Sequence, residues 1–237
     1  MLGAVVAREA LADLPAPEAP ERRHAERHRL AEIFGVSPEH VISLRQVHGT
    51  DCFSITRDNR DGQDADDPCF GQGDALFTRE AGIVLAIRTA DCLHVFFTLR
   101  DADENSLGVG LIHAGWRGLK AGVCEAALDQ ALGELPPETR PARIDVWIGP
   151  AISGERYEVG PEVAGEFPLS TPRANVPGKF WLDLPGNAKL RLDEWGRLKK
   201  IALRHHADFQ ACTLADDRFF SHRGGDAGRD LNCIMML

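Results

Sequence analysis

Three apolar runs that follow one another closely constrain the fold of this chain more than any other feature. They span residues 83–88, 94–99 and 107–113, with a polar turn at 101–106. Short runs rich in Val, Ile, Leu and Phe predict buried strands. Because only short turns separate these runs, we expect the strands to lie beside one another as hairpin-like neighbours.

Helical patterns lie on both sides of this strand-rich centre. Apolar residues recur at helical spacing in 21–34, where Gly35 is a stop signal, in 118–132 and in 187–203. Shorter strands are predicted at 41–44, 52–55, 143–148 and at both ends of the tail 219–237, with a loop over 57–73. Helices and strands mix without a strict βαβ rhythm, which indicates an α+β protein with sheet packed on sheet and helices outside.

The sequence shows no internal repeat and no clear linker. We therefore expect one domain over residues 1–237, with residues 1–20 irregular around the Pro-rich stretch 13–20.

Composition and charge exclude several classes of function. The net charge of −9 argues against a general nucleic-acid or anionic-membrane binder, although a local Arg cluster would still suit a small anion. No apolar run has the length of a membrane span, and the start of the chain lacks the charged and apolar regions of a signal peptide. The six Cys contain no CxxC pair, which is typical of reduced cytoplasmic thiols. We expect a cytoplasmic monomer or homodimer.

The stretch HAGWRG, residues 113–118, is the strongest candidate for chemistry. It ends a predicted strand and precedes a predicted helix. His113 is suited to act as a base or metal ligand, and Arg117 offers a fork of donors for an oxyanion. The alternatives are a core His bonded to backbone and a Trp116 that only packs.

Two further strand ends carry matching residues. His48 lies in RQVHG and Cys92 in TADC, each after a predicted strand. Alone, His48 fits a surface turn and Cys92 fits a buried thiol equally well. Together with His113 they suit Zn²⁺ with one open position, and copper is also compatible. The same residues could instead form a Cys nucleophile with a His base. Spacing alone leaves these possibilities open.

The remaining polar loops give weaker signals. Residues 149–153 and 157–160 fit a pocket wall or ordinary loops, and His222 with Arg223 fits an anion site or an exposed turn. His205 and His206 are expected at the end of a helix, where cations complement the dipole, and His94 is ambiguous.

Seven motifs in order give the chain a family resemblance: RQVHG, GDALFT, IRTADC, HAGWRG, IGPAIS, YEVG and FFSHR. From about Leu30 onward the chain resembles the YfiH-like multicopper polyphenol oxidase, or laccase-domain, family. Members of this family are also described as purine nucleoside phosphorylases with adenosine deaminase side activity, and some as peptidoglycan editing factors. The resemblance implies a four-layer α-β-β-α sandwich with mixed sheets.

The resemblance also implies a site and an activity. His48, Cys92 and His113 would be the catalytic or metal-binding residues, with zinc as the expected metal and copper as the other candidate. Residues on motif positions that would line the pocket and bind substrate or phosphate are Arg45, Arg117, His222 and Arg223. The expected activity is phosphorolysis of adenosine- or inosine-type nucleosides, so the partners would be a purine nucleoside and phosphate.

Other functions remain as alternatives, and the sequence departs from the family pattern. The alternatives are a cysteine hydrolase acting on peptidoglycan precursors, a zinc-stabilised binding module, and a copper-dependent phenol oxidase, which the 9 His disfavour. The family usually has Cys where Ala151 and Arg156 stand here, and its N-terminal Phe-containing strand and Gly-Gly turn are replaced by DLPAPEAP. These departures concern the pocket edge and substrate selectivity, not the three central residues.

Overall fold

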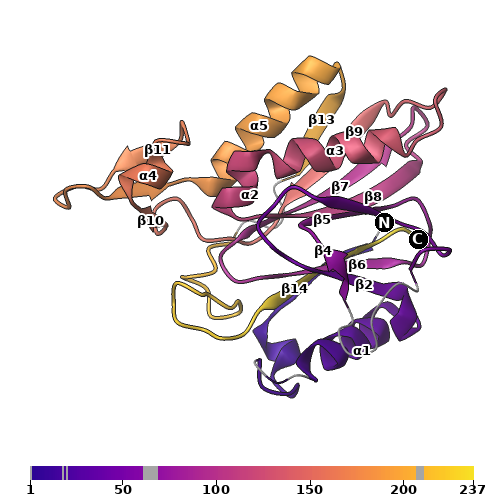
Figure 1. The fold of residues 1–237 in the computed structure, drawn as a ribbon, viewed down its shortest axis with the longest axis horizontal. Helices are drawn as coiled ribbons and strands as arrows, with labels where there is room; N and C mark the ends of the chain where they lie inside the picture. Colours follow the sequence, from indigo (N-terminus) through magenta and orange to yellow (C-terminus); the bar gives the residue numbers. More distant parts are fainter. Residues whose placement is uncertain (1, 18, 20, 61–68, 207–210) are drawn as a thin grey trace.

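Two mixed β-sheets pack face to face between outer layers of helices (Figure 1). The computed structural model describes residues 2–17, 19, 21–60, 69–206 and 211–237. Helix α1 (Arg22–Phe34) covers the outer face of one sheet, while α3 (Val123–Gly133) and α5 (Leu184–Lys199) cover the outer face of the other. The α+β class and the four-layer α-β-β-α sandwich expected from the sequence are therefore confirmed.

The first sheet joins the two ends of the chain. Its strands lie in the order β1 (Leu2–Val6), β14 (Asp230–Met235), β6 (Val84–Thr89), β2 (Val41–Arg45) and β4 (Cys69–Gln72). β14 pairs antiparallel with both β1 and β6, and β2 pairs parallel with β6 and β4.

The expectation that residues 1–20 are irregular is wrong for two segments, β1 and the 3-10 helix η1 (Arg8–Leu11). β1 owes its structure to β14, which lies at the far end of the sequence, so no local pattern marks it.

The second sheet has the order β13 (Ala202–His206), β9 (Arg143–Ile148), β7 (Leu93–Arg100), β8 (Ser106–Ala114), β5 (Ala75–Thr78) and β3 (Cys52–Ile55). β7 and β8 form the antiparallel hairpin expected from the apolar runs. β3 and β5 pair parallel, as do β9 and β13.

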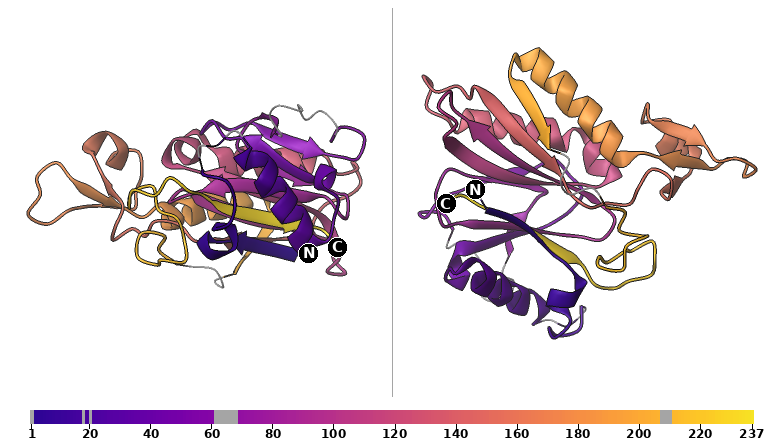
Figure 2. Two further views of the ribbon diagram at one scale, coloured as in Figure 1. Left: turned by 90° about the horizontal axis from the view of Figure 1, so that it is seen from below. Right: turned by 180° about the vertical axis from the view of Figure 1, so that it is seen from behind.

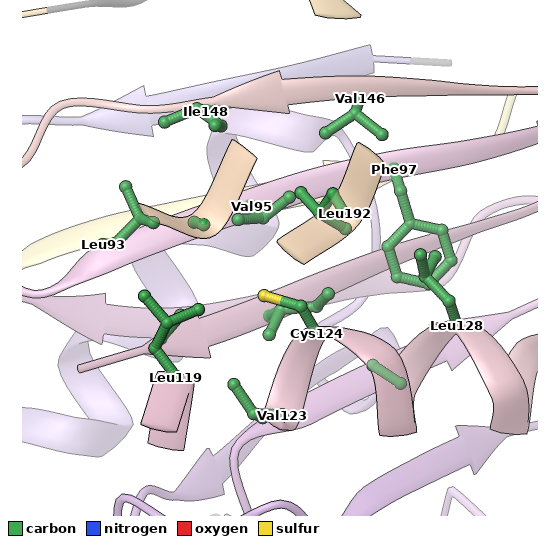
Figure 3. Packing of buried hydrophobic residues seen from close by; sticks show 14 of the residues in the cluster. Leu93, Val95, Phe97, Leu119, Val123, Cys124, Leu128, Val146, Ile148 and Leu192 are labelled. Carbon is green, nitrogen blue, oxygen red and sulfur yellow. The ribbon is translucent and has the colours of Figure 1, made fainter. Parts of the chain in front are cut away.

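Side-chain alternation in β7 and β8 fills two apolar layers at once. Leu93, Val95 and Phe97 face the helices, where Leu128 and Leu192 pack on them (Figure 3). Phe96 of β7 and Val109 and Leu111 of β8 face the first sheet. A strand that is buried on both faces reads as a nearly continuous apolar run, which is why these strands were recognisable in the sequence.

A small third sheet projects from one end of the sandwich (Figures 1 and 2). Its order is β10 (Glu158–Val159), β12 (Phe180–Leu182) and β11 (Ser170–Pro172), and the short helix α4 (Pro161–Ala164) lies beside it. Its sequence carried no clear strand signal, because each strand is at most three residues long.

The helices expected over 118–132 and 187–203 have different boundaries in the structure. The helix expected over 118–132 is two helices, α2 (Trp116–Ala121) and α3, because Gly122 adopts φ 95° between them. The helix expected over 187–203 begins at Leu184, where the Asp183 carboxylate accepts from the amide of Gly186, and it ends at Lys199.

His205 and His206 consequently lie on β13, so their placement at a helix end was wrong. The tail likewise contains one strand, β14, and the strand expected near Phe219 is absent from this described part of the chain. β4 occupies the end of the loop expected over 57–73, of which residues 61–68 lie outside the described residues. No helix in the described part of the chain is long and apolar enough to cross a membrane.

Gly149, at the end of β9, is required by the His94 ring packed against it. His94 is buried, and burial lowers its pKa to about 3, so the ring is neutral. A Cβ at position 149 would overlap the ring. We expect Gly149→Ala to lower the free energy of unfolding by about 1–3 kcal/mol, measured by urea denaturation.

Gly133→Ala is the matched control, because nothing lies within 4 Å of its added Cβ. This helical substitution should be neutral or stabilise the protein by up to about 1 kcal/mol. Equal losses of stability in the two variants would contradict the packing role of Gly149.

Candidate active site

A cavity of about 520 Å³ opens where strand ends from both large sheets meet the start of α2. This volume is within the range of small-molecule sites. The residues that line it are Arg23, Gln46, His48, Arg88, Thr89, Ala90, Cys92, His113, Trp116, Arg117, Tyr157, His222 and Arg229. His48 follows β2, Cys92 lies in the turn from β6 to β7, and His113 is near the end of β8.

The structure brings His48, Cys92 and His113 together. Their ligand atoms all lie within 4.8 Å of one another, and the Cys92 Sγ is 4.0 Å from His48 Nε2. The two imidazole rings meet edge to face, with centroids 4.9 Å apart. Gly115 passes so close that an added Cβ would lie 2.8 Å from His48 Cδ2 and 3.2 Å from Cys92 Sγ. The first Gly of HAGWRG is therefore needed for the backbone to pass the cluster.

Asp74, which the sequence interpretation did not single out, organises this cluster. Its buried carboxylate accepts hydrogen bonds from the backbone amides of Val47, His48 and Gly49, at 3.3, 3.0 and 2.6 Å. The Asp74 Oδ1 also lies 2.7 Å from His113 Nδ1. His48 adopts φ 61°, a left-handed conformation that these backbone bonds stabilise. The only sequence signal was an acidic residue immediately before a buried strand, in the motif GDALFT.

The contacts among Asp74, His113 and Cys92 favour the charged form of each side chain. Burial opposes protonation of His113, but hydrogen bonds to Asp74 and Cys92 raise its pKa to about 9. Burial likewise opposes the Cys92 thiolate, but hydrogen bonds from His113 and His48 lower its pKa to about 6. The pKa of Asp74 lies below its usual value, because the bonds from His113 and Gly49 outweigh burial. At neutral pH the cluster is thus a thiolate, an imidazolium and a carboxylate.

The three residues also fit a metal ion. Two imidazoles and one thiolate are a common zinc set, and Asp74 on His113 Nδ1 is the usual outer partner of a ligating His. The set is equally compatible with copper, and geometry does not choose between the two ions.

A second buried carboxylate, Asp91, positions the C-terminal loop over the cavity. Its oxygens accept from Thr213 Oγ1 at 2.6 Å, from Ser221 Oγ at 2.8 Å and from the Arg223 amide at 2.6 Å. These bonds hold His222 against the cavity beside Cys92, the residue that follows Asp91. The sequence interpretation noted Asp91 only as the neighbour of Cys92.

Three of the four predicted anion-binding residues lie at this site. Arg117 and His222 line the main cavity, and Arg223 lines a smaller adjoining one, with its guanidinium over the Tyr157 ring at 5.2 Å. Arg45 is exposed on β2 and lines neither cavity. Trp116 is a cavity wall and stacks with Arg117 at 4.7 Å, so its role exceeds simple packing.

Two of the family departures, Ala151 and Arg156, lie outside the main cavity. Ala151 is buried and forms a bridge to Cys212, and Arg156 is exposed; neither lines the main cavity. Sequence reasoning missed the cavity residues Arg23 and Arg229, and it gave no role to Gln46 and Arg88, although both lie in the motifs RQVHG and IRTADC.

The fold and the site together define a laccase-domain protein. The chain belongs to the family described as multi-copper polyphenol oxidoreductase laccase, whose model matches residues 14–237. The resemblance seen in the motifs is thereby confirmed.

Relatives and solved structures agree with this assignment. The chain is 36% identical over 209 residues to a Streptomyces griseus protein named purine nucleoside phosphorylase ORF3, covering 84% of this chain and 75% of that protein. It is 35% identical over 206 residues to the Pseudomonas aeruginosa protein named purine nucleoside phosphorylase PA4543, covering 83% and 73%. The crystal structure of YlmD from Geobacillus stearothermophilus superposes with a TM-score of 0.71 at 32% identity, covering 92% and 81%.

The low pKa of Cys92 predicts its reactivity. In metal-free protein, the rate of alkylation of Cys92 by iodoacetamide should rise with a midpoint near pH 6 and be nearly flat from pH 7 to 8. Mass spectrometry of the peptide that contains Cys92 measures the rate of alkylation. Cys124 is the internal control, because burial raises its pKa to about 12 and should keep it unreactive. Added Zn²⁺ should protect Cys92 if the cluster binds it. A midpoint near pH 9 would contradict the charge separation.

Proposed function

We propose that this chain is a purine nucleoside phosphorylase acting with phosphate on adenosine- or inosine-type nucleosides. The observation that carries the proposal is the buried His113, with Nδ1 2.7 Å from Asp74 Oδ1, in one cavity with several arginines. The names of the relatives supply the class of substrate.

Each part of this arrangement matches a need of the reaction. The bond from C1′ to the purine nitrogen breaks, a phosphate oxygen bonds to C1′, and the leaving base takes up a proton. The sugar develops oxocarbenium character, so catalysis needs an anion held by cations and a proton donor. His113 supplies the proton, and Arg117, His222 and Arg223 hold the phosphate. Trp116 and Tyr157 offer ring surfaces for the purine.

A metal ion would be held by His48, Cys92 and His113. When bound there, it would lower the pKa of a coordinated water, the chemistry that an adenosine deaminase side activity needs. His113 cannot be a metal ligand and the proton donor at once. Loss of phosphorolysis with a chelator would favour the ligand role, and full activity in chelator would favour the proton donor.

The direct test is release of hypoxanthine and ribose 1-phosphate from inosine, with and without inorganic phosphate. We expect release that depends on phosphate. Inosine binding without any base release in phosphate would refute the proposal.

A second candidate is a cysteine hydrolase acting on peptidoglycan precursors. It is favoured by the contacts that join Cys92 to His113 and His113 to Asp74, because they match a nucleophile, its base and an orienting carboxylate. An acyl adduct on Cys92 in mass spectra, formed in the presence of chelator, would establish this activity. A blue absorption band in copper-loaded protein would indicate a copper–thiolate bond to Cys92, which a copper-dependent phenol oxidase would need.

A further inference from the structure

One wall of the main cavity is strongly cationic. Arg23 of α1, Arg88 of β6 and Arg229, just before β14, all line it, and none belongs to the cluster around Cys92. β14 runs beside β6, with Leu231 paired to Arg88, which brings Arg229 and Arg88 close together.

This wall is distinct from the aromatic side of the cavity. Arg23 and Arg88 also line a small cavity against α1, whereas Trp116 and Tyr157 line another one beside Cys92. The main cavity therefore has a cationic end, toward α1, and an aromatic end, toward α2 and the C-terminal loop.

Among the residues that the structure describes, the cationic end has few carboxylates. Arg88 pairs with Glu26, with Nε to Oε2 at 3.1 Å, but the same carboxylate also pairs with Arg22 at 2.8 Å. The side chain of Arg23 donates to Cys69 Sγ, and that of Arg229 donates to the carbonyls of Ala227 and Gly228. Among the carboxylates that the structure describes, neither Arg23 nor Arg229 has an ion-pair partner. Within the described part of the chain, Glu26 is thus shared by Arg22 and Arg88, and Arg23 and Arg229 keep their charges uncompensated by a carboxylate.

These cations are held in place before any ligand arrives. The side-chain amide of Gln46 makes two hydrogen bonds to the backbone of Arg88. The Arg88 N–H donates to Gln46 Oε1, and Gln46 Nε2 donates to the Arg88 carbonyl, each at 2.8 Å. Burial lowers the pKa of Arg88; the charge of Glu26 opposes this effect, and the nearby charges of Arg23 and Arg229 add to it. A bound anion would offset these like charges.

We propose that Arg23, Arg88 and Arg229 form a subsite for a phosphate-type dianion. Guanidinium forks match phosphate oxygens, and three of them on one wall favour a doubly charged group over a carboxylate. The ligand is either inorganic phosphate or a phosphate ester at the 5′ position of the nucleoside, and the choice between these sources rests on the proposed function. For inorganic phosphate, these arginines would bind the same ion as Arg117, His222 and Arg223; for a 5′-phosphate ester, the two groups of cations would bind different phosphates.

The first test measures binding without turnover. Inorganic phosphate and inosine 5′-monophosphate are titrated by calorimetry into the wild-type protein, Arg23→Met, Arg229→Met and the double variant. Each single change should weaken binding of at least one of these anions about tenfold, and the double change further. Arg29→Met is the control, because Arg29 lies on the same helix but pairs with Asp13 outside the cavity. Thermal melting confirms that each variant is folded.

The second test identifies the source of the phosphate group. A raised KM for phosphate with inosine as substrate identifies inorganic phosphate as the ligand. A selective loss of turnover of inosine 5′-monophosphate relative to inosine identifies a phosphorylated nucleoside. Unchanged affinity for both anions in the folded double variant, or no binding of either by the wild type, overturns the subsite. Absence of phosphorolysis, with anion binding that still depends on Arg23 and Arg229, refutes only the proposed function.

Discussion

Replacing Cys92 by serine is expected to lower kcat/KM for inosine phosphorolysis by about 10³-fold. Serine has nearly the same shape as cysteine, but its hydroxyl carries no negative charge at neutral pH. The variant therefore removes the anion that helps to raise the pKa of His113, as well as one of three possible metal ligands. Steady-state assays of base release at pH 7.5 measure the effect. The loss is expected whether Cys92 acts as an ionic partner of His113 or as a metal ligand.

Cys212→Ser is the matched control for this variant. Cys212 is half-buried, accepts from the Ser153 amide at 3.4 Å, and does not line the main cavity. Its replacement should change kcat/KM by less than about threefold, in keeping with the small effect of distant changes. Activity of Cys92→Ser within a few-fold of the wild type would remove Cys92 from the chemistry.

Asp74→Asn is expected to destabilise the protein by about 3 kcal/mol and to lower kcat/KM by about 10²-fold. An amide cannot accept from three backbone N–H groups and His113 at once, so buried donors are left unsatisfied. His113 also loses the bond that raises its pKa and orients its ring. Denaturant unfolding and steady-state kinetics measure the two effects.

The stability effect of this variant has a defined pH dependence. The pKa of Asp74 is lower in the folded protein than its ordinary value near 4, so its contribution is complete above that value and is lost as the pH falls through the folded-state pKa. The stability gap between wild type and Asp74→Asn should thus be constant from about pH 5 to 6 and shrink below about pH 4. It should also shrink as the pH rises above about 6.5, because Asp74 helps to raise the pKa of His113 to about 9 and this stabilisation is lost toward that pH. Asp101→Asn, in an exposed turn with similar backbone bonds, should lower the free energy of unfolding much less, because water can satisfy the freed amides. Equal losses in the two variants would show that Asp74 has no special structural role.

Local patterns identified the parts of the fold that local physics controls. The strands β6, β7 and β8 were predictable because burial on both faces requires unbroken apolar runs. The end of α1 was predictable because Gly35 adopts the left-handed conformation that closes the helix. β1 was not predictable, since its order comes from pairing with a strand at the other end of the chain.

The sequence by itself determined the fold class and the three residues His48, Cys92 and His113, because a reactive side chain at the end of a strand signal stands out within a few residues. Only the tertiary structure decided their charge states, which depend on distances to Asp74 and on burial. It alone also showed that Asp91 holds the loop of His222 and that Arg23, Arg88 and Arg229 share one wall. Acidic and basic residues look alike along a chain whether they face solvent or a cavity. Electrostatic coupling falls off with distance in space, and positions in the sequence do not give that distance.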